Sequence, residues 1–272
     1  MTNKIIDLQA AVEANFAEEM ACFGRGLPGA TFHQDEELTW FLTGPKGPNG
    51  VLLTTFTHTN DAHIHARITE TLNIFKSQHV QEIGWRVGPT AYPSDLSIYL
   101  QAHGLIHRAT MTCMLLHTAN VQPEPIMPPE LVIEEVVDKE TLKVKCDVER
   151  RGFGSTEAMA QKYYQSYTHS GFGAGTAWHH YIGWLNNKPI AVAALLLHKG
   201  VAGIYGLTTI EEARRQGAGE TLTRYVVQEA KKLNYSVVTL SPTDMSEAIY
   251  RRIGFRDYCK LYHYRLSVTQ EN

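Results

Sequence analysis

The sequence predicts an α+β protein made of two related domains. A Pro-rich segment divides the chain, with Pro123, Pro125, Pro128 and Pro129 close together. On both sides of it, apolar runs of strand length alternate with helical patterns. The order of these elements in the first half is repeated in the second, which indicates a tandem duplication. The 272 residues are enough for two domains of ordinary size.

The composition excludes several classes of protein. Hydrophobic residues make up 43% and charged residues 19%, as in an ordinary globular protein. The formal net charge of −3 gives no bulk positive field, so nucleic acid is not expected as a partner. No apolar run approaches the ~20 residues of a membrane span, and no secretory signal is evident. The four scattered cysteines argue against a zinc ribbon and fit the reduced thiols of a cytoplasmic protein.

Residues 1–118 form the first predicted domain. Apolar residues at helical spacing predict helices at 5–22, 62–77 and 95–103. Runs rich in β-branched and aromatic residues predict strands at 37–43, 51–57, 82–87 and 105–117. Gly24 and Gly26 are expected to end the first helix.

Residues 119–130 are the predicted linker, because clustered prolines cannot extend a strand or a helix interior. Residues 131–272 form the second predicted domain. Its strands are expected at 131–137, 177–185, 189–198, 201–209, 236–240 and 258–266. Its helices are expected at about 138–150, 156–168, 217–233 and 244–253. Asn186 and Asn187 predict a tight hairpin turn.

The strand 201–209 runs into a glycine-rich loop, residues 214–219, at the start of a helix. The first N–H groups of a helix have no partner within it, and the helix dipole favours an anion there. Gly217 and Gly219 lack a Cβ, so a pyrophosphate could approach the backbone closely. An ordinary strand–turn–helix can also use such glycines, so the loop alone leaves both interpretations open.

The wider pattern resembles the GNAT superfamily of acyl-CoA-dependent N-acyltransferases. The resemblance rests on a strand, the Arg-x-x-Gly-x-Gly loop, a helix, a strand and the segment Ile-Tyr-x-x-x-Gly-Phe ending at Phe255, in that order. It covers about residues 131–266. It implies two tandem GNAT-like domains, each a mostly antiparallel twisted sheet flanked by helices. The first copy has no such loop and has Leu100 opposite Tyr250, so it is expected to be degenerate, with one CoA site per chain.

The resemblance also implies roles for individual residues. The pantetheine arm of acetyl-CoA would pair with the backbone of Leu207, Thr208 and Thr209. The pyrophosphate would be held by Arg214, Arg215, Gln216, Gly217, Ala218, Gly219, Glu220 and Thr221. Thr243, at a place where the family often has Asn, and Ser246 would complete the cofactor site. Tyr250 would act as the general acid that protonates the departing thiolate, and no metal would be required.

One expected residue is missing. Many relatives have a glutamate base at a place that falls near Gly203 in this sequence, where no carboxylate stands. The remaining candidates are Tyr205 acting through water, His179, His180, Glu134 and Glu135, or no base if the acceptor arrives neutral. The sequence does not choose among them. His63 and His65 are expected to point apart rather than to bind a metal.

The sequence therefore predicts an acetyltransferase that moves the acetyl group of acetyl-CoA to a primary amine of a small molecule or peptide by direct attack. A backbone N–H near Leu207 would stabilise the tetrahedral oxyanion. Two alternatives remain open: a regulatory module that binds CoA or acyl-CoA without catalysis, and a protein acetyltransferase. The expected oligomeric state is a monomer or a homodimer.

Overall fold

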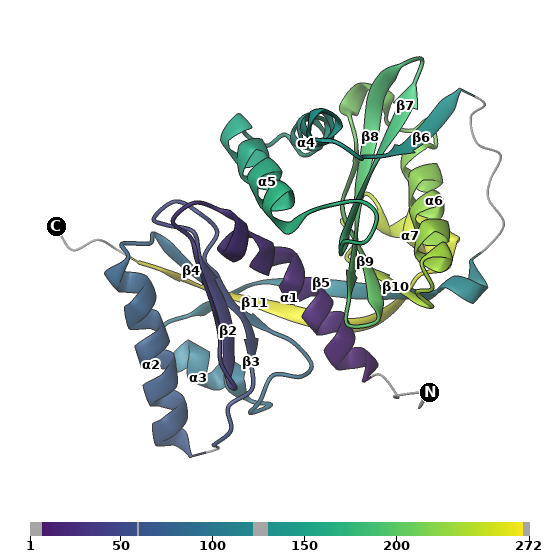
Figure 1. Ribbon diagram of the computed structural model, residues 1–272. Coiled ribbons are helices and arrows are strands. Elements are labelled where there is room, and N and C mark those ends of the chain that lie inside the picture. Colours follow the sequence, from purple (N-terminus) through teal and green to yellow (C-terminus); the bar gives the residue numbers. More distant parts are fainter. Residues whose placement is uncertain (1–6, 59, 122–129, 269–272) are drawn as a thin grey trace. The chain divides into compact units, whose positions relative to one another are not determined.

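The computed structural model describes residues 7–58, 60–121 and 130–268 (Figure 1). They form two compact units, and both mix helices with strands, as the sequence predicts. The first unit comprises Asp7–Thr112 together with the segment from Cys259 onward, and the second runs from Cys113 to Tyr258. Residues 122–129 of the expected linker lie outside the described residues. Within the described ranges, no helix is long and apolar enough to cross a membrane.

The first unit has helices on both faces of its sheet. Its strands, in spatial order, are β1 (Thr31–Gln34), β2 (Leu38–Leu42), β3 (Gly50–Thr54), β4 (Glu82–Val87) and β11 (Arg256–Ser267). Its helices are α1 (Leu8–Gly26), α2 (Asp61–Ser77) and α3 (Leu96–Ala102). Pairing is antiparallel except between β3 and β4.

The alternation of side chains along β2 explains why α1 is longer than predicted. Trp40 points into the core and meets the Phe75 ring of α2 edge-on at 5.5 Å. Phe41 points to the other face, where a Cβ on Gly24 of α1 would lie 2.6 Å from the Phe41 Cβ. The expectation that Gly24 ends the helix is wrong, because here glycine allows the helix to approach the strand closely.

The strand β1 was not predicted from the sequence. A turn at Asp35 joins it to β2, and the Asp35 Oδ1 accepts hydrogen bonds from the N–H groups of Glu37 (2.8 Å) and Leu38 (2.7 Å). The side chain thus substitutes for a backbone turn.

The second unit carries the predicted glycine-rich loop. Its strands, in spatial order, are β5 (Ile106–His117), β10 (Val237–Leu240), β9 (Val201–Thr209), β8 (Lys188–His198), β7 (Trp178–Leu185) and β6 (Leu131–Glu135). Its helices are α4 (Lys139–Phe153), α5 (Glu157–Ser170), α6 (Ala218–Lys232) and α7 (Glu247–Ile253), with short 3₁₀ turns η1 (Thr118–Asn120) and η2 (Glu211–Ala213). Only β9 and β10 pair in parallel.

Helices cover both faces of this second sheet (Figure 1). Thr208 of β9 lies against Gly152 of α4, whereas Thr209 lies near Gly219 of α6. Because neighbouring side chains of a strand point to opposite faces, α4 and α6 lie on opposite sides of β9. The hairpin predicted at Asn186 and Asn187 is confirmed, since both residues have positive φ, 50° and 57°.

Each unit takes a strand from the other half of the sequence. The end of β5 pairs with β10, with Met114 opposite Leu240. The chain's last strand, β11, pairs with β4, with Tyr262 opposite Val87. The boundary between the units therefore falls within β5 and within β11.

Candidate active site

The end of β9 contains a β-bulge. The register with β8 shifts between Val192 and Ala194, so that Gly206 and Leu207 together oppose Ala193. Gly206 has φ +56°, a conformation that favours glycine. The bulge reorients the backbone at the place where the sequence predicts an oxyanion-stabilising N–H.

On its edge opposite β8, β9 pairs with β10 over a short distance. Among the described residues, the ladder with β10 covers Ala202 and Gly203. Leu207–Thr209 lie beyond that ladder, so an extended ligand can pair with their backbone groups as an added strand would.

Arg214 fixes the loop that follows β9. Its Nε donates to the carbonyl oxygen of Thr209 (3.1 Å), and its Nη2 donates to that of Gly152 on α4 (2.8 Å). Arg215 and Gly217 both have left-handed φ, +62° and +83°. Turns that include such conformations direct successive N–H groups into one concavity, which suits an anion.

The start of α6 is open to a ligand. Gly217 is its N-cap and supplies no capping side chain, so the first-turn N–H groups can bind an anion. Apart from its chain neighbours, no described residue lies within 4 Å of the place where a Cβ on Gly217 would stand. Gln216 is exposed, whereas Ala218 and Thr221 are buried and pack the helix against the sheet.

Glu220 places a carboxylate in the first turn of α6, where it would oppose an anion. Two arginines neutralise it. Arg252 Nε on α7 donates to Glu220 Oε2 at 3.2 Å, and Arg224 Nη2 donates to Glu220 Oε1 at 3.0 Å. The hydrogen bond from Arg252 is the main reason why the pKa of Glu220 is lowered, and Arg224 adds to it against the effect of burial. This group is therefore cationic overall.

The remaining predicted site residues lie at and before α7. Thr243 N–H donates to the Ser246 Oγ (2.9 Å), and the two hydroxyl oxygens are 3.0 Å apart, so the pair closes the turn before the helix. Tyr250 is 6% exposed, and its ring meets Phe255 edge-on at 5.9 Å. Burial raises the pKa of Tyr250, while a hydrogen bond with Ser246 opposes the rise. The phenol is thus protonated at neutral pH, as a general acid requires.

A buried ion pair that the sequence analysis missed lies beside the bulge. Lys145 Nζ donates to Glu149 Oε2 at 2.6 Å, and both side chains come from α4. The other carboxylate oxygen, Oε1, lies 2.1 Å from where a Cβ on Gly206 would stand. The sequence does contain a signal for this ion pair. Lys145 and Glu149 are opposite charges one helical turn apart, and they lie on the same face of the helix as the apolar Leu142 and Cys146.

A cluster of aromatic rings lies beside this ion pair. Lys145 Nζ lies 4.4 Å from the centre of the Tyr167 ring, and that ring packs against His180 at 4.3 Å. His180 stacks on Trp178 at 5.7 Å. Burial, and then the charge of Lys145, lower the pKa of His180 well below its usual range, so the imidazole is neutral. Neither ring nitrogen of His180 has a hydrogen-bond partner among the residues that the structure describes.

The other base candidates lie in different surroundings. His179 Nδ1 pairs with Glu135 Oε1 at 2.7 Å, and strand alternation places His179 on the face of β7 opposite His180. Glu134 is exposed on β6. The Tyr205 ring lies 6.2 Å from Trp178. Of the five candidates, His180 and Tyr205 are thus the ones near the aromatic cluster.

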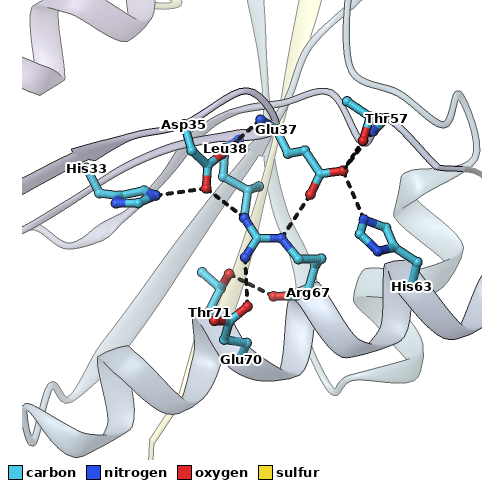
Figure 2. Close-up of polar contacts among 9 residues, drawn as sticks. All are labelled: His33, Asp35, Glu37, Leu38, Thr57, His63, Arg67, Glu70 and Thr71. Carbon is cyan, nitrogen blue, oxygen red and sulfur yellow. Dashed lines mark hydrogen bonds and ion pairs between the residues drawn. The ribbon is translucent and has the colours of Figure 1, made fainter.

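In the first unit, a carboxylate network links the β1–β2 turn to the β3–α2 loop and to α2 (Figure 2). Glu37 Oε1 accepts hydrogen bonds from the Thr57 N–H (2.8 Å) and hydroxyl (2.7 Å), and Oε2 accepts one from Arg67 Nε (2.9 Å). His63 Nε2 lies 2.9 Å from Oε1. Partial burial opposes these hydrogen bonds, which nevertheless lower the pKa of Glu37 to about 2.

The start of α2 also differs from that of α6. The Asn60 side chain caps α2 by accepting the His63 N–H at 2.7 Å, and Asp61 adds negative charge in the first turn. His65 Nδ1 lies 2.9 Å from His103 Nε2, so His63 and His65 have separate partners. A capped, acidic helix start disfavours a pyrophosphate.

Comparisons with known proteins agree with this description. Residues 149–255 match the family described as the Acetyltransferase (GNAT) family. The curated proteins contain no match to this chain.

Solved structures share the fold over nearly the whole chain. A GCN5-related N-acetyltransferase from Kribbella flavida has a TM-score of 0.72 at 16% identity, covering 94% of this chain and 95% of its own. A tandem GNAT protein from the clavulanic acid biosynthesis pathway has a TM-score of 0.68 at 13% identity, covering 96% of each chain. A GCN5-related N-acetyltransferase from Sphaerobacter thermophilus has a TM-score of 0.65 at 13% identity, covering 96% and 90%.

Within the second unit, residues 149–255 therefore form a domain of the kind found in GNAT acetyltransferases. The predicted tandem arrangement is confirmed by the fold that the chain shares with a tandem GNAT protein. Acetyl-CoA is the co-substrate of this family. Two features fit such a ligand: the open start of α6 at Gly217, and the part of β9 after Gly203 that does not pair with β10 in the described residues.

Proposed function

We propose that this protein transfers the acetyl group of acetyl-CoA to a primary amine of a small molecule or peptide. One observation carries the proposal: a single compact unit contains the bulged end of β9, the anion cradle at the start of α6 and the buried Tyr250. In the proposed complex, Leu207–Thr209 pair with the pantetheine arm of acetyl-CoA, and Arg214–Thr221 hold its pyrophosphate.

The reaction is a direct attack of the amine on the thioester carbonyl. Positioning of the two reactants supplies much of the rate. The backbone N–H near Leu207 donates to the developing oxyanion, and Tyr250 donates its proton to the departing thiolate. Thr243 and Ser246 hold the turn that precedes Tyr250.

We place one acetyl-CoA site in each chain, in the second unit. The Glu37 network and the capped start of α2 support this proposal, because they put negative charge where the first unit would need an anion cradle. The described cysteines Cys22, Cys113, Cys146 and Cys259 are all free thiols, which fits a reducing compartment such as the cytoplasm.

Incubation with radiolabelled acetyl-CoA and a panel of acceptors tests this function. The panel contains ethylamine, a polyamine, an amino sugar, a lysine-containing peptide and a folded protein. We expect label in at least one small amine or peptide. Tight acetyl-CoA binding without transfer to any acceptor would favour the regulatory module, and label in the folded protein alone would favour a protein acetyltransferase.

A further inference from the structure

We propose that Glu149 is the general base that deprotonates the acceptor ammonium, and that Lys145 is the positioning residue for its carboxylate. This inference rests on the proposed function, since it assigns a residue to the acceptor half of that reaction. It also supplies a carboxylate that the sequence does not offer near Gly203.

The location of Glu149 is the first argument. Its Oε1 occupies the volume that a side chain at residue 206 would fill, 2.1 Å from the Cβ position. Gly206 is half of the bulge and directly precedes Leu207, whose N–H faces the reacting carbonyl in the proposed reaction. The carboxylate thus reaches this point of β9 from α4, and the glycine leaves room for it.

The state of the carboxylate is the second argument. Lys145 Nζ donates to Oε2 at 2.6 Å, which leaves Oε1 as the oxygen that faces Gly206. Tyr167 stabilises the ammonium of Lys145 from its ring face at 4.4 Å. A buried carboxylate needs such a cation to remain ionised. An ionised carboxylate attracts a cationic amine and can accept its proton.

The other groups of the cluster suit this role less well. The titratable side chains near the pair include Cys146 on α4, Tyr167 on α5 and His180 on β7. His180 is neutral and packs on Tyr167 and Trp178. It therefore offers no charge to a cationic acceptor.

The proton balance of the reaction is complete with these groups. Glu149 Oε1 takes one proton from the ammonium, and the neutral amine forms a C–N bond to the thioester carbon. The C–S bond then breaks, and the thiolate takes a proton from Tyr250. The second proton that nitrogen loses in becoming an amide restores Tyr250, and Glu149 releases its proton to solvent. One proton is released for each acetyl group transferred.

The test compares acceptors of different basicity. Ethylamine is protonated at neutral pH and needs a base, whereas trifluoroethylamine is mostly neutral and does not. We expect Glu149→Gln to lower kcat/KM for ethylamine about 100-fold, as loss of a general base does. For trifluoroethylamine we expect a loss below about tenfold, with the Kd of acetyl-CoA unchanged. Asp147→Asn removes a half-exposed carboxylate of the same helix, where Asp147 pairs with Arg150. It is the matched control and should affect neither amine.

A second variant guards against misfolding, because Glu149→Gln leaves Lys145 buried without its partner. Lys145→Met/Glu149→Gln removes both charges, a change that proteins often tolerate. The folded double variant should show the same loss for ethylamine. Ethylamine turnover near the wild-type rate in either variant, or equal losses for both amines, would overturn the role of Glu149. A wild type that acetylates no amine would overturn the proposed function itself and this inference with it.

Discussion

Arg214 of the glycine-rich loop donates to the carbonyl oxygen of Gly152 at the end of α4, with Nη2 and O 2.8 Å apart. A second bond, to Thr209, ties the same side chain to β9. The loop that would bind the pyrophosphate is therefore anchored to the helix that carries Glu149.

Replacing Arg214 should weaken cofactor binding. Arg214→Ala removes a positive charge and both anchoring bonds, so we expect the Kd of acetyl-CoA to rise about tenfold, or about 1.4 kcal/mol. Isothermal titration calorimetry measures this. Arg265→Ala, which removes an equal charge from the first unit, where Arg265 pairs with Glu82, is the control and should leave the Kd unchanged. Equal effects of the two variants would indicate a general effect of charge.

Gly217 should be required both for backbone conformation and for access of the ligand. Its φ of +83° means that Gly217→Ala costs about 1–2 kcal/mol of stability. The added Cβ also obstructs the cradle, so we expect acetyl-CoA affinity to fall at least about tenfold. Gly29→Ala is the matched control, since Gly29 has φ +74° and equally open surroundings in the first unit. It should lose similar stability in urea unfolding and keep acetyl-CoA binding.

Tyr250→Phe separates chemistry from binding. Loss of the general acid should lower kcat about 100-fold and leave the Kd of acetyl-CoA within about twofold. The pKa of Tyr250 is raised above 10.0, so any alkaline decline in kcat that is due to this phenol should lie above that pH and be absent from the variant. Tyr235→Phe serves as the control in the same unit. Full turnover by Tyr250→Phe would exclude the acid role.

The Glu37 network should make the stability of the first unit depend on pH. The folded-state pKa of Glu37 is lowered from 4.5 to about 2, so the stabilisation is present above about pH 4.5 and is lost as pH falls through about 2. Glu37→Gln should therefore reduce the free energy of unfolding by about 2–3 kcal/mol at neutral pH and progressively less in acid. Urea unfolding at several pH values measures this. Glu70 pairs with the same Arg67 but is largely exposed, so Glu70→Gln should lower the free energy of unfolding by less than about 1 kcal/mol.

Much of the second unit could be predicted because its signals are local. The hairpin at Asn186 and Asn187 depends on residues next to each other, and so does the glycine-rich start of α6. The helix α1 shows the limit of such signals. From the sequence alone, Gly24 predicts a helix end. Its actual role is to let α1 approach Phe41, and that contact depends on tertiary packing.

The parts that escaped prediction depend on contacts distant in sequence. Nothing local indicates that β11 pairs with β4 or that the end of β5 pairs with β10. Likewise, Lys145 and Glu149 have the spacing of an ordinary surface pair on a helix. Their burial, and the approach of Glu149 to Gly206, follow only from the packing of α4 on β9.

Titration of acetyl-CoA into the intact protein tests most directly whether the second unit alone binds the acyl donor. We expect one molecule bound per chain. Gly217→Asp/Gly219→Asp, which puts carboxylates into the cradle, should abolish binding, whereas Asp61→Asn at the start of α2 should leave it unchanged. Two molecules per chain, or full binding by the double aspartate variant, would contradict the assignment of the site.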